Sequence, residues 1–115
     1  QVWGDGTPVR EFIYSEDVAE GLIFLMNNYN AANGHINIGT GVGQTIKELY
    51  ETVMKILDYR GQLRFDTSKP NGTHLKVSDV SKIHKLGWRS RMSLKEGIQK
   101  TYIDLQKANF QWKEK

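Results

Sequence analysis

The stretch Trp3-Gly-Asp-Gly-Thr-Pro-Val-Arg-Glu-Phe-Ile-Tyr-Ser-Glu-Asp17 decides the fold of this chain. It is a polar, turn-rich loop that leads into a short apolar strand, and a helix is predicted to follow at once. Gly4 and Gly6 let the backbone bend and approach a ligand closely. Pro8 fixes its own φ and favours extended geometry in the residue before it. The stretch therefore predicts a loop that delivers one arginine, Arg10, onto a strand.

Arg10 lies among apolar residues of this strand, where a charge without a partner would be costly. Two interpretations of its partner stay open. Its planar guanidinium group suits a phosphate, which it can contact through two N–H donors at once. Alternatively, it forms an ion pair with Asp5, Glu11 or Asp17. The spacing of these residues favours neither interpretation.

The segment Lys69-Pro-Asn-Gly-Thr-His-Leu-Lys76 is a second candidate, because two lysines flank a turn-forming Pro-Asn-Gly. Lys76 follows a short extended segment, and its ammonium group could neutralise a phosphate as a point charge. By composition alone the segment is a solvent-facing loop. Trp3 would either stack on a base or sugar ring or cover the edge of the core.

The run Gly39-Thr-Gly-Val-Gly-Gln44 invites a dinucleotide-binding interpretation, because its glycines lead into a predicted helix. The spacing is wrong, since the G-x-G-x-x-G fingerprint requires glycine at position 44. We predict a tight strand-to-helix turn instead. A Tyr-x-x-x-Lys pair is also absent after Tyr14, because position 18 is Val, and we assign no catalytic residue. No metal site is assigned to the three histidines, His35, His74 and His84, whose spacing is not that of metal ligands.

Capping signals and apolar periodicity predict the helices. They are residues 16–28 capped by Ser15, a helix from the Thr45–Glu48 capping box to about Asp58, a short helix from Ser78 or Asp79 to Gly87, and a last helix from the Ser93–Glu96 capping box.

Short strands are predicted at residues 35–38 and 62–67, so the expected fold is a small mixed α/β layer forming one domain, residues 1–115. The first helix should face the core with Val18, Leu22, Leu25, Met26 and Tyr29. The tail from Asn109, with Phe110 and Trp112, is expected to fray or to dock on a partner.

The composition limits the class of protein. A length of 115 residues and a hydrophobic content of 38% fit one globular domain, and no apolar run approaches the ~20 residues of a spanning helix. The absence of cysteine excludes disulfides, cysteine nucleophiles and cysteine-based zinc sites, and fits a cytoplasmic protein. The chain opens without a leader or an initiator Met, so we expect a segment of a longer protein.

Charge is divided unevenly along the chain. Residues 1–45 carry five acidic and one basic side chain, a net charge of −4, whereas residues 46–115 carry eight and 15, a net charge of +7. A basic half could contact nucleic acid or a phosphorylated small molecule. Most of the basic residues follow predicted helix faces, which favours a solvated surface.

The spacing G-x-G-x-x-x-R-x-F-x-Y-x-x-D from Gly4 to Asp17 resembles the loop that opens the substrate-binding half of the extended short-chain dehydrogenases, which are nucleotide-sugar epimerases, dehydratases and reductases. Within that superfamily, Trp3 and the segments His35–Leu49 and Phe65–Lys76 are most similar to the GDP-L-fucose synthase family. The second loop departs from the family pattern at three positions: Asn71 replaces Asp, His74 replaces Pro and Leu75 replaces Arg.

This resemblance implies that Trp3, Arg10, Asn71 and Lys76 contact a GDP-sugar, GDP-4-keto-6-deoxy-D-mannose. It also implies NADP as cofactor, bound by an N-terminal domain that this chain does not contain, together with the catalytic Ser, Tyr and Lys. The longer enzyme would be a cytoplasmic homodimer, without a membrane or nucleic-acid partner. The chain alone is therefore predicted to be inactive.

Two alternatives stay open. The nearer is another NAD-dependent epimerase or dehydratase of the same superfamily, acting on a different nucleotide sugar. The more distant is a small basic module that binds nucleic acid, which rests on the basic half and on Trp88-Arg-Ser-Arg91. No recognised nucleic-acid motif accompanies those residues.

Overall fold

A computed structural model describes residues 1–108 as α-helices and short strands, and the mixed α/β class predicted from the sequence is confirmed. The elements follow in the order β1 (Val2–Trp3), β2 (Val9–Glu11), α1 (Ser15–Asn28), the 3-10 helix η1 (Ala31–Asn33), β3 (Gly43–Thr45), α2 (Ile46–Ile56), β4 (Phe65–Asp66), β5 (Leu75–Lys76), α3 (Ser81–Lys85) and α4 (Leu94–Lys107). The predicted tail from Asn109 lies outside the described residues.

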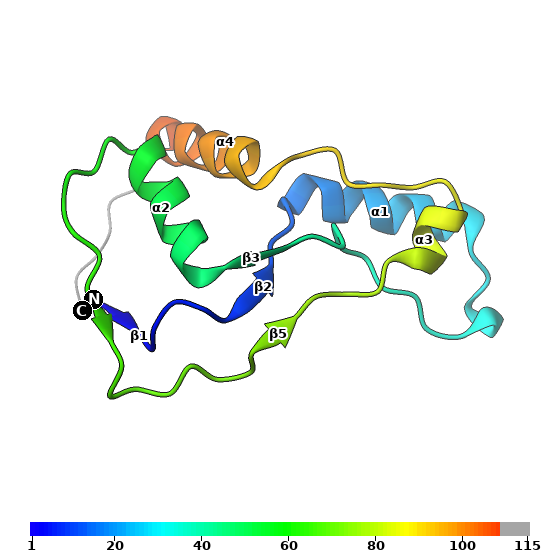
Figure 1. Ribbon diagram of the computed structural model, residues 1–115. Coiled ribbons are helices and arrows are strands. Elements are labelled where there is room, and N and C mark those ends of the chain that lie inside the picture. The colour runs from blue at the N-terminus through cyan, green and yellow to red at the C-terminus, as the bar shows by residue number, and fades with distance from the viewer. Residues whose placement is uncertain (109–115) are drawn as a thin grey trace.

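The strands form two small sheets. β2 is central in a three-stranded sheet of order β3-β2-β5, antiparallel to β3 and parallel to β5, while β1 pairs in parallel with β4. Figure 1 shows the three-stranded sheet between two helix pairs, α2 with α4 at one end and α1 with α3 at the other.

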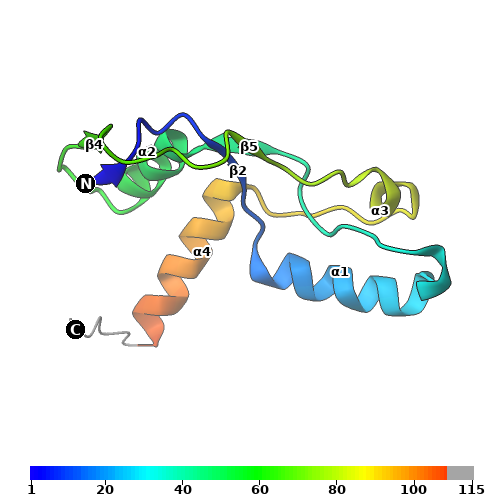
Figure 2. The same cartoon turned by 90° about the horizontal axis from the view of Figure 1, so that it is seen from below.

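The core lies at the α1–α3 end. Val80, Ile83 and Trp88 are buried there, with Ile83 fully enclosed, and partly buried side chains of α1 and of the segment before β3 pack on them. The radius of gyration is 16.9 Å, larger than the ~13 Å typical of a compact 100-residue domain. Figure 2 shows one cause, because α4 projects away from the sheet. The described residues therefore leave much apolar surface uncovered.

Both predicted capping boxes are confirmed. The hydroxyl of Thr45 accepts the backbone N–H of Glu48 (3.1 Å), and the carboxylate of Glu48 accepts the N–H of Thr45 (2.7 Å). Ser93 and Glu96 make the same reciprocal bonds at the start of α4. These hydrogen bonds lower the pKa of both carboxyl groups. The bond from the Thr45 backbone has the largest effect on Glu48, and the bond from the Ser93 hydroxyl has the largest effect on Glu96.

Other predicted boundaries were wrong. Ser15 is the first residue of α1 and not its cap; the cap position is Tyr14, whose side chain makes no capping bond. Residues 35–38 form no ladder with any described strand, although Ile36 and Ile38 pack on the core. The strand predicted at 62–67 is reduced to β4, because its partner β1 has two residues.

The predicted buried face of α1 was partly wrong. Leu25 packs on the core, but Leu22 is 52% exposed and Met26 is 83% exposed. The helix instead turns Gly21 inward, where a Cβ would lie 3.0 Å from the ring of Trp88. An apolar face of α1 thus points to solvent.

At the start of α3, Asp79 accepts the backbone N–H of Ser81 (2.9 Å), one position before the helix cap. The helix ends before Gly87, whose φ is +102°. No helix within residues 1–108 has the length and apolar character needed to cross a bilayer.

Candidate functional site

Two segments far apart in the sequence run side by side and carry the four predicted ligand-binding residues. In the β1–β4 ladder Trp3 is in register with Asp66. Beyond it, the N–H of Gly4 donates to the carbonyl of Asp66 (2.9 Å), and the N–H of Val9 donates to the carbonyl of His74 (2.8 Å). Figure 1 shows the blue and green segments meeting at both ends of these loops.

Asn71 joins the two loops directly. Its Oδ1 accepts the backbone N–H of Asp5 at 2.9 Å. A Cβ on Gly4 would lie 2.1 Å from the same oxygen, and the φ of Gly4 is +79°, so both space and backbone conformation require glycine there. Asn71 therefore shapes the first loop, in addition to any contact that it makes with a ligand.

The carboxylate of Asp5 is used within its own loop. It accepts the backbone N–H of Thr7 (2.9 Å) and the Thr7 hydroxyl (2.7 Å). These bonds, the hydroxyl bond first, lower the pKa of Asp5. Asp5 thus stabilises the turn before β2 and does not pair with Arg10.

Arg10 stands at the centre of a row across the three-stranded sheet. It is in register with Gln44 on β3 and with Lys76 on β5. Because side chains in register on neighbouring strands point to the same face, these three side chains share one side of the sheet. Arg10 is half-buried and Lys76 is exposed, so two cations meet at one surface.

The ion-pair interpretation of Arg10 was wrong. Its Nη1 donates to the carbonyl of Val9 (2.7 Å), and no described carboxylate lies within ion-pair distance. Its Nη2 lies 3.7 Å from the position of a Cβ on Gly72, so the guanidinium group reaches the second loop. Arg10 retains N–H donors for an anion at that place.

Trp3 is 68% exposed, so it does not cover the core. The Nζ of Lys69 lies 5.7 Å from the centre of its ring, within the range of a cation–π contact. The two loops therefore hold an aromatic ring beside a lysine, and Asn71 lies against the backbone of the residues that follow Trp3.

The carboxylate of Glu11 lies inside the glycine-rich turn at residues 39–41 and accepts its backbone N–H groups. Its Oε1 accepts the backbone N–H groups of Thr40 and Gly41, the second at 2.7 Å, and its Oε2 accepts the N–H of Ser78 at 2.8 Å. A Cβ on Gly39 would lie 2.3 Å from Oε1, so the carboxylate fills the turn. Turns of this kind often bind phosphates; here an internal carboxylate occupies those donors.

The pKa of Glu11 reflects two opposing effects. Burial, the largest single effect, raises it, but the hydrogen bonds from Ser78, Gly41 and Thr40 together outweigh burial and lower it. Glu11 is therefore ionised at neutral pH.

Asp17, the last residue of the quoted stretch, is 4% exposed and also binds backbone. Its Oδ2 accepts the N–H groups of Arg91 (3.1 Å) and Met92 (2.9 Å). It thereby holds the segment that leads into α4 against the start of α1. This role, like that of Glu11, was not predicted.

The sequence contained a weak signal for these roles. Glu11 is a second charged residue beside Arg10 on β2. Gln44 was predicted to lie in a turn, but it lies on β3. Gln44 Oε1 is buried without a hydrogen-bond partner among the described residues. Within the same residues no group of His, Asp and Glu side chains is arranged to hold a metal ion.

Known proteins are similar in sequence to most of this chain. The model of the NAD dependent epimerase/dehydratase family matches residues 1–39, which include β1, β2 and α1. A GDP-L-fucose synthase from Escherichia coli (strain K12) is 44% identical over 109 residues, covering 88% of this chain and 34% of that protein. The chain belongs to the NAD dependent epimerase/dehydratase family.

Solved structures of this family share the fold. A GDP-6-OMe-4-keto-L-xylo-heptose reductase from C. jejuni has a TM-score of 0.88 and 40% identity, covering 94% of this chain and 34% of that one. A GDP-mannoheptose C4 reductase from Campylobacter jejuni with NADP bound has a TM-score of 0.79 and 41% identity, covering 89% of this chain and 33% of that one. The chain thus spans about one third of the length of these relatives.

Proposed function

We propose that this chain is the C-terminal, GDP-sugar-binding portion of an NADP-dependent epimerase-reductase similar to GDP-L-fucose synthase. Such an enzyme would epimerise GDP-4-keto-6-deoxy-D-mannose at C3 and C5 and reduce C4. One observation carries the proposal: Arg10 and Lys76 share one face of the sheet, beside loops that present Trp3 and Asn71. The near alternative is another nucleotide-sugar epimerase or dehydratase of the family.

Each residue has a distinct role in this proposal. The guanidinium group of Arg10 and the ammonium group of Lys76 would bind the diphosphate, and the exposed ring of Trp3 would stack on the base or a sugar. Contacts so far from the reacting carbons position the sugar for chemistry performed elsewhere. The described residues would therefore bind and orient the substrate.

The described residues do not fit NADP. Their one glycine-rich turn was predicted to run from a strand into a helix, but it follows no strand and leads into β3. It donates its N–H groups to Glu11, and a pyrophosphate would have to displace that carboxylate. We therefore propose that the cofactor and the catalytic Ser, Tyr and Lys belong to another part of the protein. The cytoplasmic and homodimeric state of the enzyme stays a prediction.

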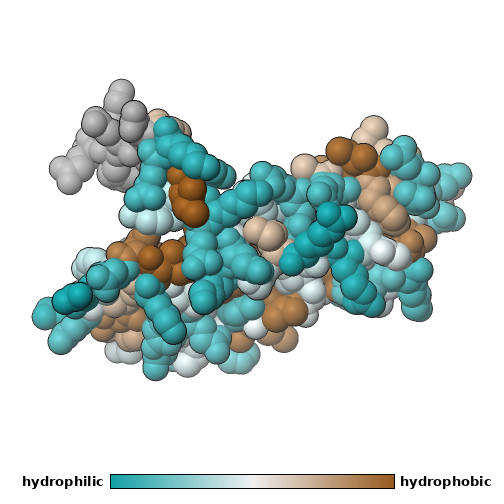
Figure 3. Space-filling view, turned by 90° about the horizontal axis from the view of Figure 1, so that it is seen from above, coloured by the Kyte–Doolittle hydropathy of each residue, from teal (hydrophilic) through white to brown (hydrophobic). Residues whose placement is uncertain are grey.

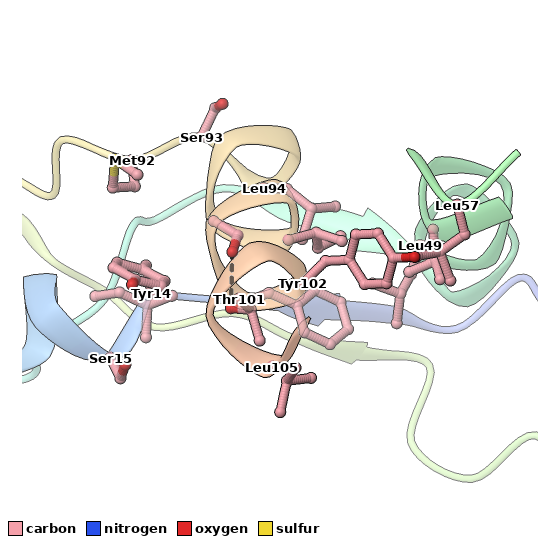
Figure 4. A pocket seen from close by; sticks show the side chains of 15 residues that line it. Tyr14, Ser15, Leu49, Leu57, Met92, Ser93, Leu94, Thr101, Tyr102 and Leu105 are labelled. Carbon is pink, nitrogen blue, oxygen red and sulfur yellow. Dashed lines mark hydrogen bonds between the residues drawn. The ribbon is translucent and has the colours of Figure 1, made fainter. Parts of the chain in front are cut away.

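Uncovered apolar surface supports the proposal that this chain is one portion of a larger protein. A groove of about 470 Å³ lies between α2 and α4, and Figure 4 shows Tyr102 of α4 directed toward Leu49 of α2 and Leu57, the residue that follows α2. Figure 3 shows apolar surface in the hollow beside α4 and a second patch over α1, where Leu22 and Met26 are exposed. Soluble monomers rarely leave patches of this kind open.

The residues of Trp88-Arg-Ser-Arg91 that suggested nucleic-acid binding have contacts within the chain. Trp88 is 8% exposed within the core, so its ring cannot stack on a base. Arg91 pairs with Glu20 (3.5 Å), and Arg89 contacts His84 (2.8 Å). These arginines serve contacts within the chain.

Arg10→Ala in the full-length protein tests the proposed function. GDP affinity should fall roughly ten- to hundredfold, because a charge-assisted hydrogen bond contributes ~1.5–3 kcal/mol, while NADPH affinity should stay the same. Isothermal titration with GDP and with NADPH measures both. Equal losses for the two ligands, or an unfolded variant, would make Arg10 structural and overturn the assignment.

Replacing four cations one at a time separates the two classes of function. A diphosphate site predicts that Lys76→Ala weakens GDP binding, more mildly than Arg10→Ala, while Lys69→Ala, Arg89→Ala and Arg91→Ala have smaller effects. A nucleic-acid module would lose affinity for DNA or RNA about equally at all four positions, with a shallower salt dependence. Equal effects would therefore contradict a specific GDP site.

A further inference from the structure

We propose that Glu11 is a positioning residue, whose carboxylate clamps the strands on both sides of β2 and thereby holds Arg10 and Lys76 on one face for a diphosphate. This inference rests on the proposed function, because it assumes that Arg10 contacts the ligand. Glu11 itself lies on the opposite face of β2, since neighbouring side chains alternate along a strand.

The clamp joins all three strands of the sheet with one side chain. Oε1 binds Thr40 and Gly41, which lead into β3, and Oε2 binds Ser78, which follows β5. The hydroxyl of Thr40 makes a further contact with Oε1 at 3.3 Å. A single carboxylate therefore ties both outer strands to the central strand at the same end of the sheet.

The strand ladders are too short to hold Arg10 and Lys76 in place by themselves. β2 and β3 have three residues each and β5 has two, whereas strands in globular proteins most often have about five or six. Arg10 and Lys76 are also like charges in register on neighbouring strands, a pairing that destabilises a sheet. The bond from Ser78 to Glu11 offsets this repulsion two residues beyond Lys76, on the side where β5 has no further ladder bonds.

Glu11 also leaves Arg10 available. A carboxylate next to an arginine in sequence would normally compete for its guanidinium group. Here both oxygens of Glu11 accept backbone N–H groups on the far face, so Arg10 has no described carboxylate partner. The same side chain thus fixes the strand and keeps the cation ready for a phosphate.

Glu11→Gln in the full-length protein is the closest variant in shape. The amide keeps one acceptor oxygen for the glycine turn, but it presents an NH₂ group to the N–H of Ser78, so the bond to the β5 side is lost. We expect GDP affinity to fall about tenfold through misplacement of the cations, with NADPH affinity unchanged. Glu51→Gln, which removes an equal charge from an exposed ion pair with Lys47, is the matched control and should have no effect.

A double-mutant cycle shows whether Glu11 acts through Arg10. In an Arg10→Ala background, adding Glu11→Gln should change the GDP dissociation constant less than twofold, because the group that it positions is gone. Hydrogen exchange of the Ser78 amide should become faster in Glu11→Gln whether or not GDP is present. If Glu11→Gln fails to fold, the cycle is repeated with Glu11→Asp, whose side chain keeps the charge but is one methylene shorter. Its effect on the GDP dissociation constant should likewise be smaller in the Arg10→Ala background.

The possible results distinguish this inference from the proposed function. Faster exchange at Ser78 with unchanged GDP affinity, or independent losses at Arg10 and Glu11, would overturn the positioning role and leave the GDP site standing. A loss of GDP and NADPH affinity together would mean that Glu11 is merely structural. If Arg10→Ala leaves GDP binding intact, the proposed function fails and the positioning role fails with it.

Discussion

Arg10 and Glu11 are neighbours in sequence but serve opposite faces of β2. The alternation of side chains along a strand separates a cation on the face proposed to bind the ligand from a carboxylate bonded to backbone. In the first loop the carboxylate of Asp5 likewise accepts the backbone N–H and the hydroxyl of Thr7. At the scale of single residues, the acids nearest to Arg10 are therefore occupied by hydrogen bonds.

Asn71→Asp tests this arrangement, and it restores the residue of the family pattern that the second loop resembles. A second carboxylate next to the backbone of Asp5 should raise the pKa of Asp5 above its present lowered value, because like charges disfavour ionisation. Titration of the Asp5 carboxyl by NMR in both proteins measures the change. An unchanged or lower pKa would show that the loops separate in the variant.

At the scale of elements, local capping rather than burial defines α2 and α4. Both helices start at reciprocal capping boxes, and within the described residues α2 has no fully buried side chain. The pKa of Glu48 is lowered in the folded state, so its contribution to stability is present above the unfolded value of ~4.3 and is lost as pH falls through the folded value.

Thr45→Ala should reduce the free energy of unfolding by about 1 kcal/mol at pH 7, because it removes the acceptor for the Glu48 N–H. The difference between variant and wild type should shrink as pH falls through the folded pKa of Glu48, where protonation weakens the box in the wild type as well. Urea denaturation of the full-length protein over a pH series measures this. Thr52→Ala, which removes a hydroxyl bond to a helix carbonyl, serves as a control without this pH dependence.

At the scale of the whole molecule, the chain is extended and its apolar faces are open. Of the described residues, few apolar side chains are buried, Val2, Pro8, Val80, Ile83 and Trp88, while α1 and the α2–α4 groove expose several more. This distribution fits a chain that spans one third of its relatives. We expect the rest of the protein to cover these faces.

Met26→Gln should therefore behave differently in the two contexts. In the isolated 115-residue chain Met26 is 83% exposed, and the substitution should change the free energy of unfolding by less than ~0.5 kcal/mol. In the full-length protein it should cost about 2 kcal/mol, since a buried methionine contributes that much. Chemical denaturation of both proteins measures the two effects. Equal small effects would show that the α1 face stays in solvent.

Local signals in the sequence determined the mixed α/β class and both capping boxes. These features depend on contacts within about four residues, which the order of side chains fixes directly. The resemblance carried by the quoted loop also determined the family.

Only the tertiary structure decided the partners of these elements. Arg10 meets Lys76 and not a neighbouring acid because β2 pairs with a strand more than 60 residues away. The face of α1 with Gly21 and Leu25 turns to the core because Trp88 packs there. Residues 35–38 have the pattern of a strand yet form no ladder, since a strand exists only when another strand offers its N–H and C=O groups. Long-range pairing of this kind depends on the packing of the whole chain, and no local pattern records it.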